Sequence, residues 1–284
     1  MKKIIIVSFI ALLALGACTE RIDIDLDQQQ YARLVVEGSI STDTTAHLVS
    51  LTKTSDYFSN QPPDPVSNAM VRIYNDSEEY ILEEKPGKSG QYYTDYGVYG
   101  TVGREYHLEI SLEEEIGGSK YYEASSKIYP INQLDSIGLE FYDWGAEGFW
   151  EVKCYVWDPP TTDYYMFHIY KNGRLVNDTV TDVFVVDDIL YNGNYTNGIG
   201  VGYFNQDQEN EKLDPGDLVT LRVSRITKEY TDFLWNIQEE VSYQTPLFSG
   251  PPANVEGNVS NGAFGAFAAY SSSYASTTVP YQEQ

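Results

Sequence analysis

Residues 47–53 read HLVSLTK, and residues 33–40 read RLVVEGSI. In the first stretch His47, Val49 and Leu51 occupy every second position. Leu34 and Val36 do the same in the second. An alternation with a period of two is typical of a strand that buries one of its faces. These two stretches therefore predict that the folded part of the chain begins with a β-sheet.

Similar short strands follow up to residue 130, with turn residues between them. We expect them at 69–74, 80–84, 91–94, 105–112 and 120–127. The prolines of residues 61–65 indicate a loop, because proline cannot donate a ladder hydrogen bond. Seven short strands in roughly 100 residues favour an antiparallel sandwich. Immunoglobulin-like and transthyretin-like arrangements both fit this pattern.

The pattern resets at residues 130–134, where we place a domain boundary. Further strands are expected at 137–143, 149–157, 164–171, 174–178, 181–186, 201–204 and 218–226, with a closing core strand at 264–270. Asn172-Gly173 predicts a hairpin turn. One amphipathic helix is expected at 227–244, with Thr227 as its N-cap. The fold prediction is therefore mainly β, with antiparallel β-sandwich-like domains at 31–130 and 131–284.

The charge balance limits the partners of this chain. Its 284 residues include 42 acidic and 18 basic side chains, which give a net charge of −24. Phosphate binding requires clustered lysine and arginine, so we expect no nucleic-acid partner. Hydrophobic residues make up 42% of the chain, which is enough to form real cores.

No group of residues in the sequence indicates catalysis. Cys154 alternates with Trp150, Val152 and Val156, which predicts a buried thiol rather than a nucleophile. The three histidines are isolated from one another along the chain, which gives no support for a zinc site. We therefore expect no enzyme activity, no cofactor and no metal.

Aromatic residues around the turn 145–148 form the candidate binding surface. These residues are Tyr142, Trp144, Phe149 and Trp157. Tyrosine and tryptophan can stack on sugars or anchor an interface, but they can equally pack in a core. Exposed rings in a concave groove would indicate ligand binding, whereas a flat apolar patch would indicate assembly.

The first 18 residues read as an export signal. Lys2 and Lys3 precede an apolar run at 4–15, which is shorter than the ~20 residues that cross a hydrocarbon core. Residues 15–18, Leu-Gly-Ala-Cys, resemble a bacterial lipobox. The resemblance implies that residues 1–17 are removed and that Cys18 becomes an acylated N-terminus. Residues 18–30 would then form a lipidated tether, anchored by several acyl chains.

Several segments together resemble a known family. They are CTE at 18–20, IDIDL at 22–26, LVVEG at 34–38, LTKTSDYF at 51–58, VSNAMV at 66–71, ITKEY at 226–230 and NVEGNVSNG at 254–262. In this order they are similar to the Bacteroidetes lipoproteins of the domain-of-unknown-function family 4249. That resemblance implies the outer membrane, on its surface or periplasmic face, and a TonB-dependent transporter of the starch-utilisation type as partner. It carries no catalytic residues.

In that context the predicted function is a binding or assembly accessory of the transporter. The alternatives are a structural envelope protein without a ligand and a carbohydrate-binding module. Thr44, Ser136 and Thr179 follow aspartate in short motifs that resemble the O-glycosylation sites of exported Bacteroidetes proteins.

The lipobox generates the first prediction. The Cys18→Ala variant should lose its acyl chains and move from the membrane fraction to the soluble fraction, as measured by fractionation and immunoblotting. Cys154→Ala serves as the control and should stay membrane-bound. An anchor elsewhere in the chain would be indicated if the Cys18→Ala variant still sedimented with the outer membrane.

Overall fold

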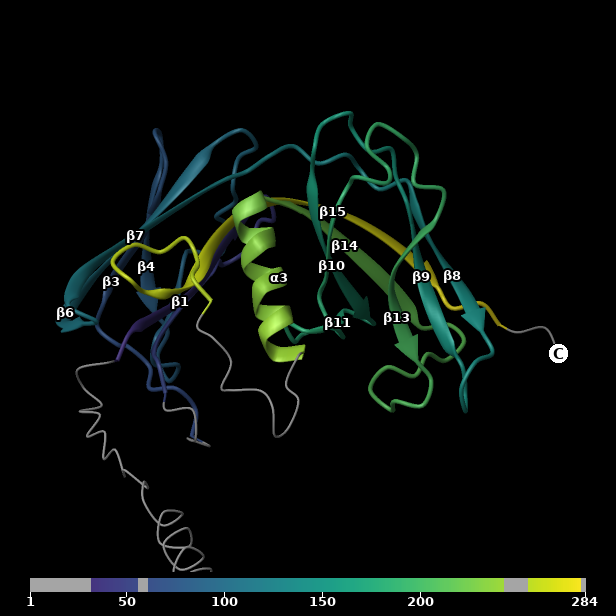
Figure 1. Cartoon of the computed structure of the whole chain (residues 1–284), viewed down its shortest axis with the longest axis horizontal. Coiled ribbons are helices and arrows are strands. Elements are labelled where there is room, and N and C mark those ends of the chain that lie inside the picture. The colour runs from purple at the N-terminus through teal and green to yellow at the C-terminus, as the bar shows by residue number, and fades with distance from the viewer. Residues whose placement is uncertain (1–31, 56–60, 243–254, 282–284) are drawn as a thin grey trace, which may run out of the picture. The chain divides into compact units, whose positions relative to one another are not determined.

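The structure is a computed structural model that describes residues 32–55, 61–242 and 255–281 (Figure 1). All of these residues belong to one compact unit, Ala32–Gln284. Fifteen strands and one helix lie in the described part, so the prediction of a mainly β fold with one helix is confirmed. The elements are β1 Leu34–Ser41, β2 Leu48–Lys53, β3 Met70–Tyr74, β4 Glu79–Glu84, β5 Gln91–Tyr93, β6 Glu105–Ile116, β7 Ser119–Lys127, β8 Ser136–Tyr142, β9 Phe149–Tyr155, β10 Tyr164–Lys171, β11 Arg174–Leu175, β12 Phe184–Asp187, β13 Ile199–Asn205, β14 Leu218–Ile226, α3 Lys228–Ser242 and β15 Phe264–Thr278.

The described strands form two sheets. The larger has 12 strands in the order β11-β10-β14-β15-β1-β2-β5-β4-β3-β6-β7, with β12 also paired to β10. The smaller has the order β13-β9-β8. Neighbouring strands are antiparallel throughout, except that β1 and β15 run parallel.

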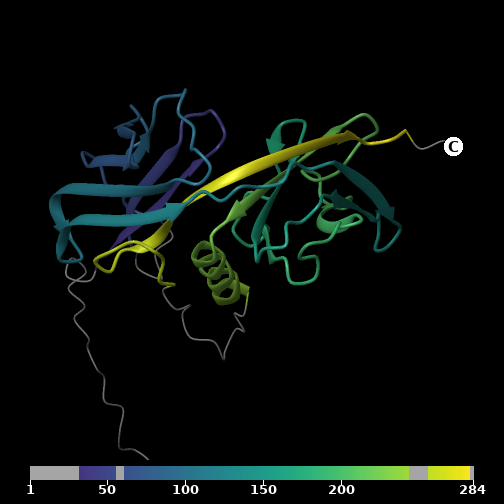
Figure 2. The ribbon, with the colours of Figure 1, turned by 90° about the horizontal axis from the view of Figure 1, so that it is seen from above.

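Strand β15 joins the two halves of the larger sheet. Its first part pairs with β1, from Val35↔Phe264 to Ser41↔Tyr270, and its second part pairs with β14 (Figure 2). Gly265 makes the parallel pairing sterically feasible. Its φ is +87°, and a Cβ at this position would lie 2.0 Å from the carbonyl oxygen of Val36. Only glycine avoids both the left-handed strain and this clash. The predicted closing strand is confirmed and extends beyond residue 270.

The N-terminal strands curl around one hydrophobic core. Buried side chains from β1, β3, β6 and β7 meet there, and Phe267 of β15 completes the cluster. The backbone N–H of Ala269 donates a hydrogen bond to Ser126 Oγ at 2.9 Å, which connects β15 to the end of β7. The last strand of the sheet is thereby brought back beside β15, and the apolar cluster is enclosed.

In the C-terminal half the small sheet packs on β10 and β14. Trp150, Val152 and Cys154 of β9 contribute to one buried cluster with Phe167 and Leu221 of the large sheet. The prediction of a buried Cys154 is therefore confirmed. The predicted Asn172-Gly173 turn is confirmed as well, since both residues have positive φ angles.

Helix α3 covers the other face of this part of the large sheet. The backbone N–H of Tyr230 donates to Thr227 Oγ1 at 3.2 Å, which confirms the predicted N-cap. Leu234 is 6% exposed and packs with Met166 and Ile226. Towards the other end of this amphipathic helix Val241 is 47% exposed, so its apolar face does not stay buried over its full length.

The remaining expectations about organisation stay predictions. Buried clusters lie on either side of residue 130, while β15 contributes to the core on both sides. The boundary at 130 therefore stays a prediction. Cys18 and the tether at 18–30 lie outside the described residues. Among the described residues, no helix has the length and apolarity required to cross a bilayer.

The helix contacts generate the second prediction. Leu234→Ala should lower the free energy of unfolding by 2–5 kcal/mol, because it leaves a cavity beneath α3. Val241→Ala, on the same helix but exposed, should change it by less than ~0.5 kcal/mol. Urea unfolding of both variants measures the difference. Equal effects would mean that α3 is not held to the sheet through Leu234.

Candidate functional site

An open cleft of about 1000 Å³ lies in the C-terminal half. One side is formed by the loop between β8 and β9 and by β13. The other side is formed by residues 176–185, and Gln238 of α3 also contributes. Pockets of roughly 300–1,000 Å³ are typical of small-molecule sites, and the cleft lies at the upper end of this range.

An aromatic cluster centred on Phe149 lies along the cleft. The ring of Tyr142 stacks on Phe149 at 5.2 Å between centroids. Trp144 and Tyr203 meet the Phe149 ring edge-on at 6.4 and 5.7 Å. Trp144 is 80% exposed, and Tyr203 is also exposed. Large rings exposed side by side in a concave surface are costly to hydrate, which is typical of a binding site.

The hairpin tip that carries Trp144 depends on Gly148. This residue has a φ of +77°, and a Cβ on it would lie 2.7 Å from the Tyr142 carbonyl oxygen. The same carbonyl accepts a hydrogen bond from the Trp144 backbone N–H at 3.0 Å. The tight turn therefore directs Trp144 away from the core and leaves Phe149 at the base of the hairpin.

Two amide side chains hold the opposite wall in place. Asn177 accepts from the backbone N–H of Ile169 at 2.8 Å and donates to the carbonyl of Phe167 at 2.9 Å. Gln238 Nε2 donates to the carbonyls of Val180 and Val183, both at 2.8 Å. These amides consequently have a structural role, and they fix the backbone of the wall without any ligand.

The charge in the cleft is negative. Asp182, Asp207 and Glu211 line it, and none of the described residues lining it is lysine or arginine. An anionic ligand would be repelled, so the lining favours a neutral or cationic ligand.

Burial and the neighbouring Glu140 raise the pKa of Tyr142, whose neutral hydroxyl donates to Glu151 at 3.3 Å.

The structure brings together three of the four aromatic residues singled out in the sequence. Tyr142, Trp144 and Phe149 form the cluster. Trp157 is exposed elsewhere and packs on Tyr195 at 5.3 Å, outside the described lining of the cleft. Tyr203 was missed. It lies two residues after buried Val201, so a period of two would place it on the buried face, whereas the register shift between Gly200 and Gly202 leaves it exposed beside Phe149.

The other residues singled out in the sequence lie outside the described lining of the cleft. Cys154 is buried, and this burial raises the pKa of its thiol to about 12, which makes a thiolate nucleophile unavailable at neutral pH. Thr44, Ser136 and Thr179 are all exposed, and their glycosylation stays a prediction. In the described part of the chain, the one cluster with metal-ligand spacing contains three aspartates and no histidine.

Comparison with known proteins identifies a family, but it assigns no reaction and no ligand. The family model described as "Domain of unknown function (DUF4249)" matches residues 19–275. The search of curated proteins found no match. The matched range includes every residue of the cleft and of the aromatic cluster.

The contrast between two tryptophans generates the third prediction. Trp144→Ala should change the free energy of unfolding by less than ~0.5 kcal/mol, because its ring is exposed. Trp150→Ala, only six residues away but buried between the sheets, should cost about 3–5 kcal/mol. Chemical denaturation followed by circular dichroism measures both. A large loss for Trp144→Ala would show that this ring belongs to the core.

Proposed function

The chain belongs to the DUF4249 family, and we propose that this member is a lipid-anchored outer-membrane protein that binds a ligand in the aromatic cleft. We propose further that it acts there as an accessory of a TonB-dependent transporter. The single observation that carries ligand binding is the pair of exposed rings, Trp144 and Tyr203, in a concave surface of about 1000 Å³.

This observation favours binding over a ligand-free structural role. A structural protein gains nothing from a hollow lined by exposed rings, whereas a binding protein gains apolar contact when the rings are covered. One wall of the cleft is also fixed by hydrogen bonds of its own, those of Asn177 and Gln238. A preformed site loses less entropy on binding than one that must order its walls.

The location and the partner rest on sequence. The lipobox ending at Cys18 supports an acyl anchor, and with it export across the inner membrane. The transporter link and the origin in Bacteroidetes rest on the resemblance of the motifs to that lipoprotein family. No catalytic group is assigned, so the proposed role is to capture a ligand and present it, not to alter it.

Carbohydrate is the ligand class that the lining favours. The apolar face of a sugar ring stacks on aromatic side chains, while its hydroxyls bond to carboxylates and amides. The cleft offers Trp144 and Tyr203 for stacking, and Asp207 and Gln208 are exposed beside them. A neutral oligosaccharide also matches the absence of positive charge among the described lining residues.

The fourth prediction tests the cleft with two exposed tryptophans. The detergent-solubilised native protein is pulled down from its own membranes, and the captured ligand and partner are identified by mass spectrometry. Trp144→Ala should weaken ligand binding about thirtyfold, since a single well-packed aromatic contact contributes ~2 kcal/mol. Trp157→Ala is the matched control, because Trp157 is exposed but lies outside the cleft.

The control variant distinguishes a contact surface at the cleft from one at the Trp157–Tyr195 pair. Unchanged capture by Trp144→Ala, at equal expression and stability, would contradict a ligand site at the cleft. Loss of capture in Trp157→Ala with retention in Trp144→Ala would move the contact surface to the Trp157–Tyr195 pair.

A further inference from the structure

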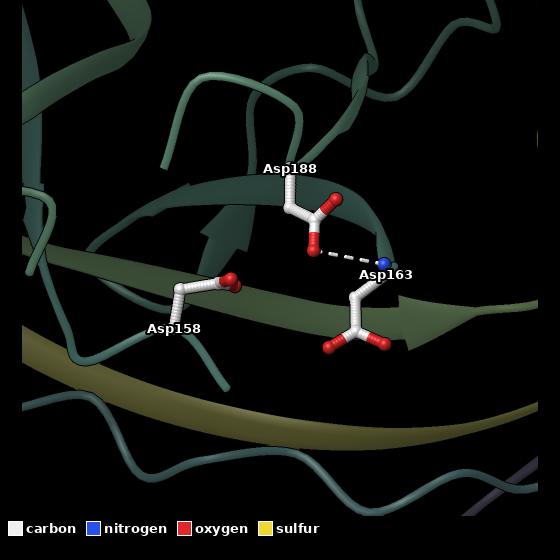
Figure 3. Close-up of side chains that lie close together, drawn as sticks. All are labelled: Asp158, Asp163 and Asp188. Atoms are coloured by element: carbon white, nitrogen blue, oxygen red, sulfur yellow. Dashed lines mark hydrogen bonds between the residues drawn. The ribbon is translucent and has the colours of Figure 1, made fainter. Parts of the chain in front are cut away.

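Three aspartates of the C-terminal half lie close together (Figure 3). Asp158 and Asp163 lie within the short connection between β9 and β10, and Asp188 directly follows β12. One carboxylate oxygen from each lies within 4.8 Å of the other two. All three side chains are buried, and none of them lines the aromatic cleft.

Two of the three carboxylates have hydrogen-bond donors on both oxygens. Asp158 accepts from the Tyr165 hydroxyl at 2.7 Å and from the Gly193 backbone N–H at 3.3 Å. Asp163 forms an ion pair with Arg225 and accepts from the Thr161 hydroxyl at 2.9 Å. These contacts hold the two side chains in fixed positions.

Asp188 is different, although it is only 3% exposed. Its Oδ2 accepts from the Asp163 backbone N–H at 2.9 Å, the bond drawn in Figure 3. Within the part of the chain that the structure describes, no donor reaches its Oδ1. A buried carboxylate oxygen without a partner is strongly unfavourable, which points to a missing ligand.

The charge of the cluster points the same way. Three carboxylates face one guanidinium, that of Arg225, which leaves two negative charges uncompensated in a buried site. Uncompensated buried charges are neutralised by protons or by a bound cation.

A cavity adjoins the cluster and offers room for such a cation. It measures about 40 Å³, and its described lining includes Asp158, Asp188 and Tyr165, while Asp163 lies outside that lining. A site of ~10–15 Å³ already holds one water molecule, so an ion with a single water fits there. The cavity supports a bound ion independently of the hydrogen bonds within the cluster.

We propose that Asp158, Asp163 and Asp188 bind one calcium ion. The ligands are all oxygens, as calcium requires, and two oxygens on opposite sides of Ca²⁺ stand up to about 5 Å apart. The separations here, all within 4.8 Å, fit that coordination sphere. Mg²⁺ usually keeps several of its waters, for which a cavity of about 40 Å³ leaves little room. The ion neutralises the two excess charges and ties the β9–β10 connection to the end of β12.

The fifth prediction concerns calcium binding by the full-length, detergent-solubilised protein after treatment with EGTA. Calorimetric titration with CaCl₂ should show one tight site per chain. The melting temperature should rise by at least ~5 °C at free Ca²⁺ a hundredfold above the dissociation constant. Asp188→Asn, which keeps an oxygen for the Asp163 N–H, should weaken binding more than about tenfold.

The matched control is Asp95→Asn, an exposed aspartate outside the cluster, which should bind Ca²⁺ like the wild type. Asp158→Asn provides a second variant if Asp188→Asn does not fold. The proposal is overturned if the wild type shows no stoichiometric binding and no thermal shift with CaCl₂. It is equally overturned if both cluster variants bind as the control does, since the chain's other carboxylates would then account for the signal.

Discussion

The arrangement of this protein depends on the pairing of β15 with two partners that are far apart in sequence. The strand runs parallel to β1 over its first part and antiparallel to β14 over its second. The last strand of the described residues is therefore an interior strand of the larger sheet. The pairing requires glycine at position 265, since any side chain there would collide with the Val36 carbonyl.

The proposed sites follow from this scaffold. Strand β14 pairs with β10, and the small sheet packs on both through the cluster that contains Trp150 and Phe167. The hairpin that follows β8 then presents Trp144 over the cleft, while Asn177 and Gln238 fix the facing wall. The ends of β9, β10 and β12 bring the three aspartates together on the same scaffold. Both sites thus consist of loops carried by well-packed strands, the usual arrangement in binding proteins.

Local patterns in the sequence predicted the elements well, but they did not predict how distant elements meet. Three predicted features depend only on neighbours a few residues away, and each is confirmed. They are the alternation at 47–53, the cap at Thr227 and the buried Cys154. The partner strands of β15, by contrast, lie more than 200 residues and about 50 residues away, and no local signal specifies them. Tyr203 and the aspartate cluster were missed for the same reason. With 42 acidic residues in the chain, no particular set of three stood out.

Native-state hydrogen exchange of β15 tests the central claim that one shared strand makes both halves a single cooperative scaffold. The amides at 266–269, which lie along β1, are compared with those at 272–275, which lie along β14. The account predicts that the protected amides of both segments exchange with the same free energy, equal to that of global unfolding. It would be contradicted if one segment exchanged at a clearly lower free energy, because that half would then open independently of the other.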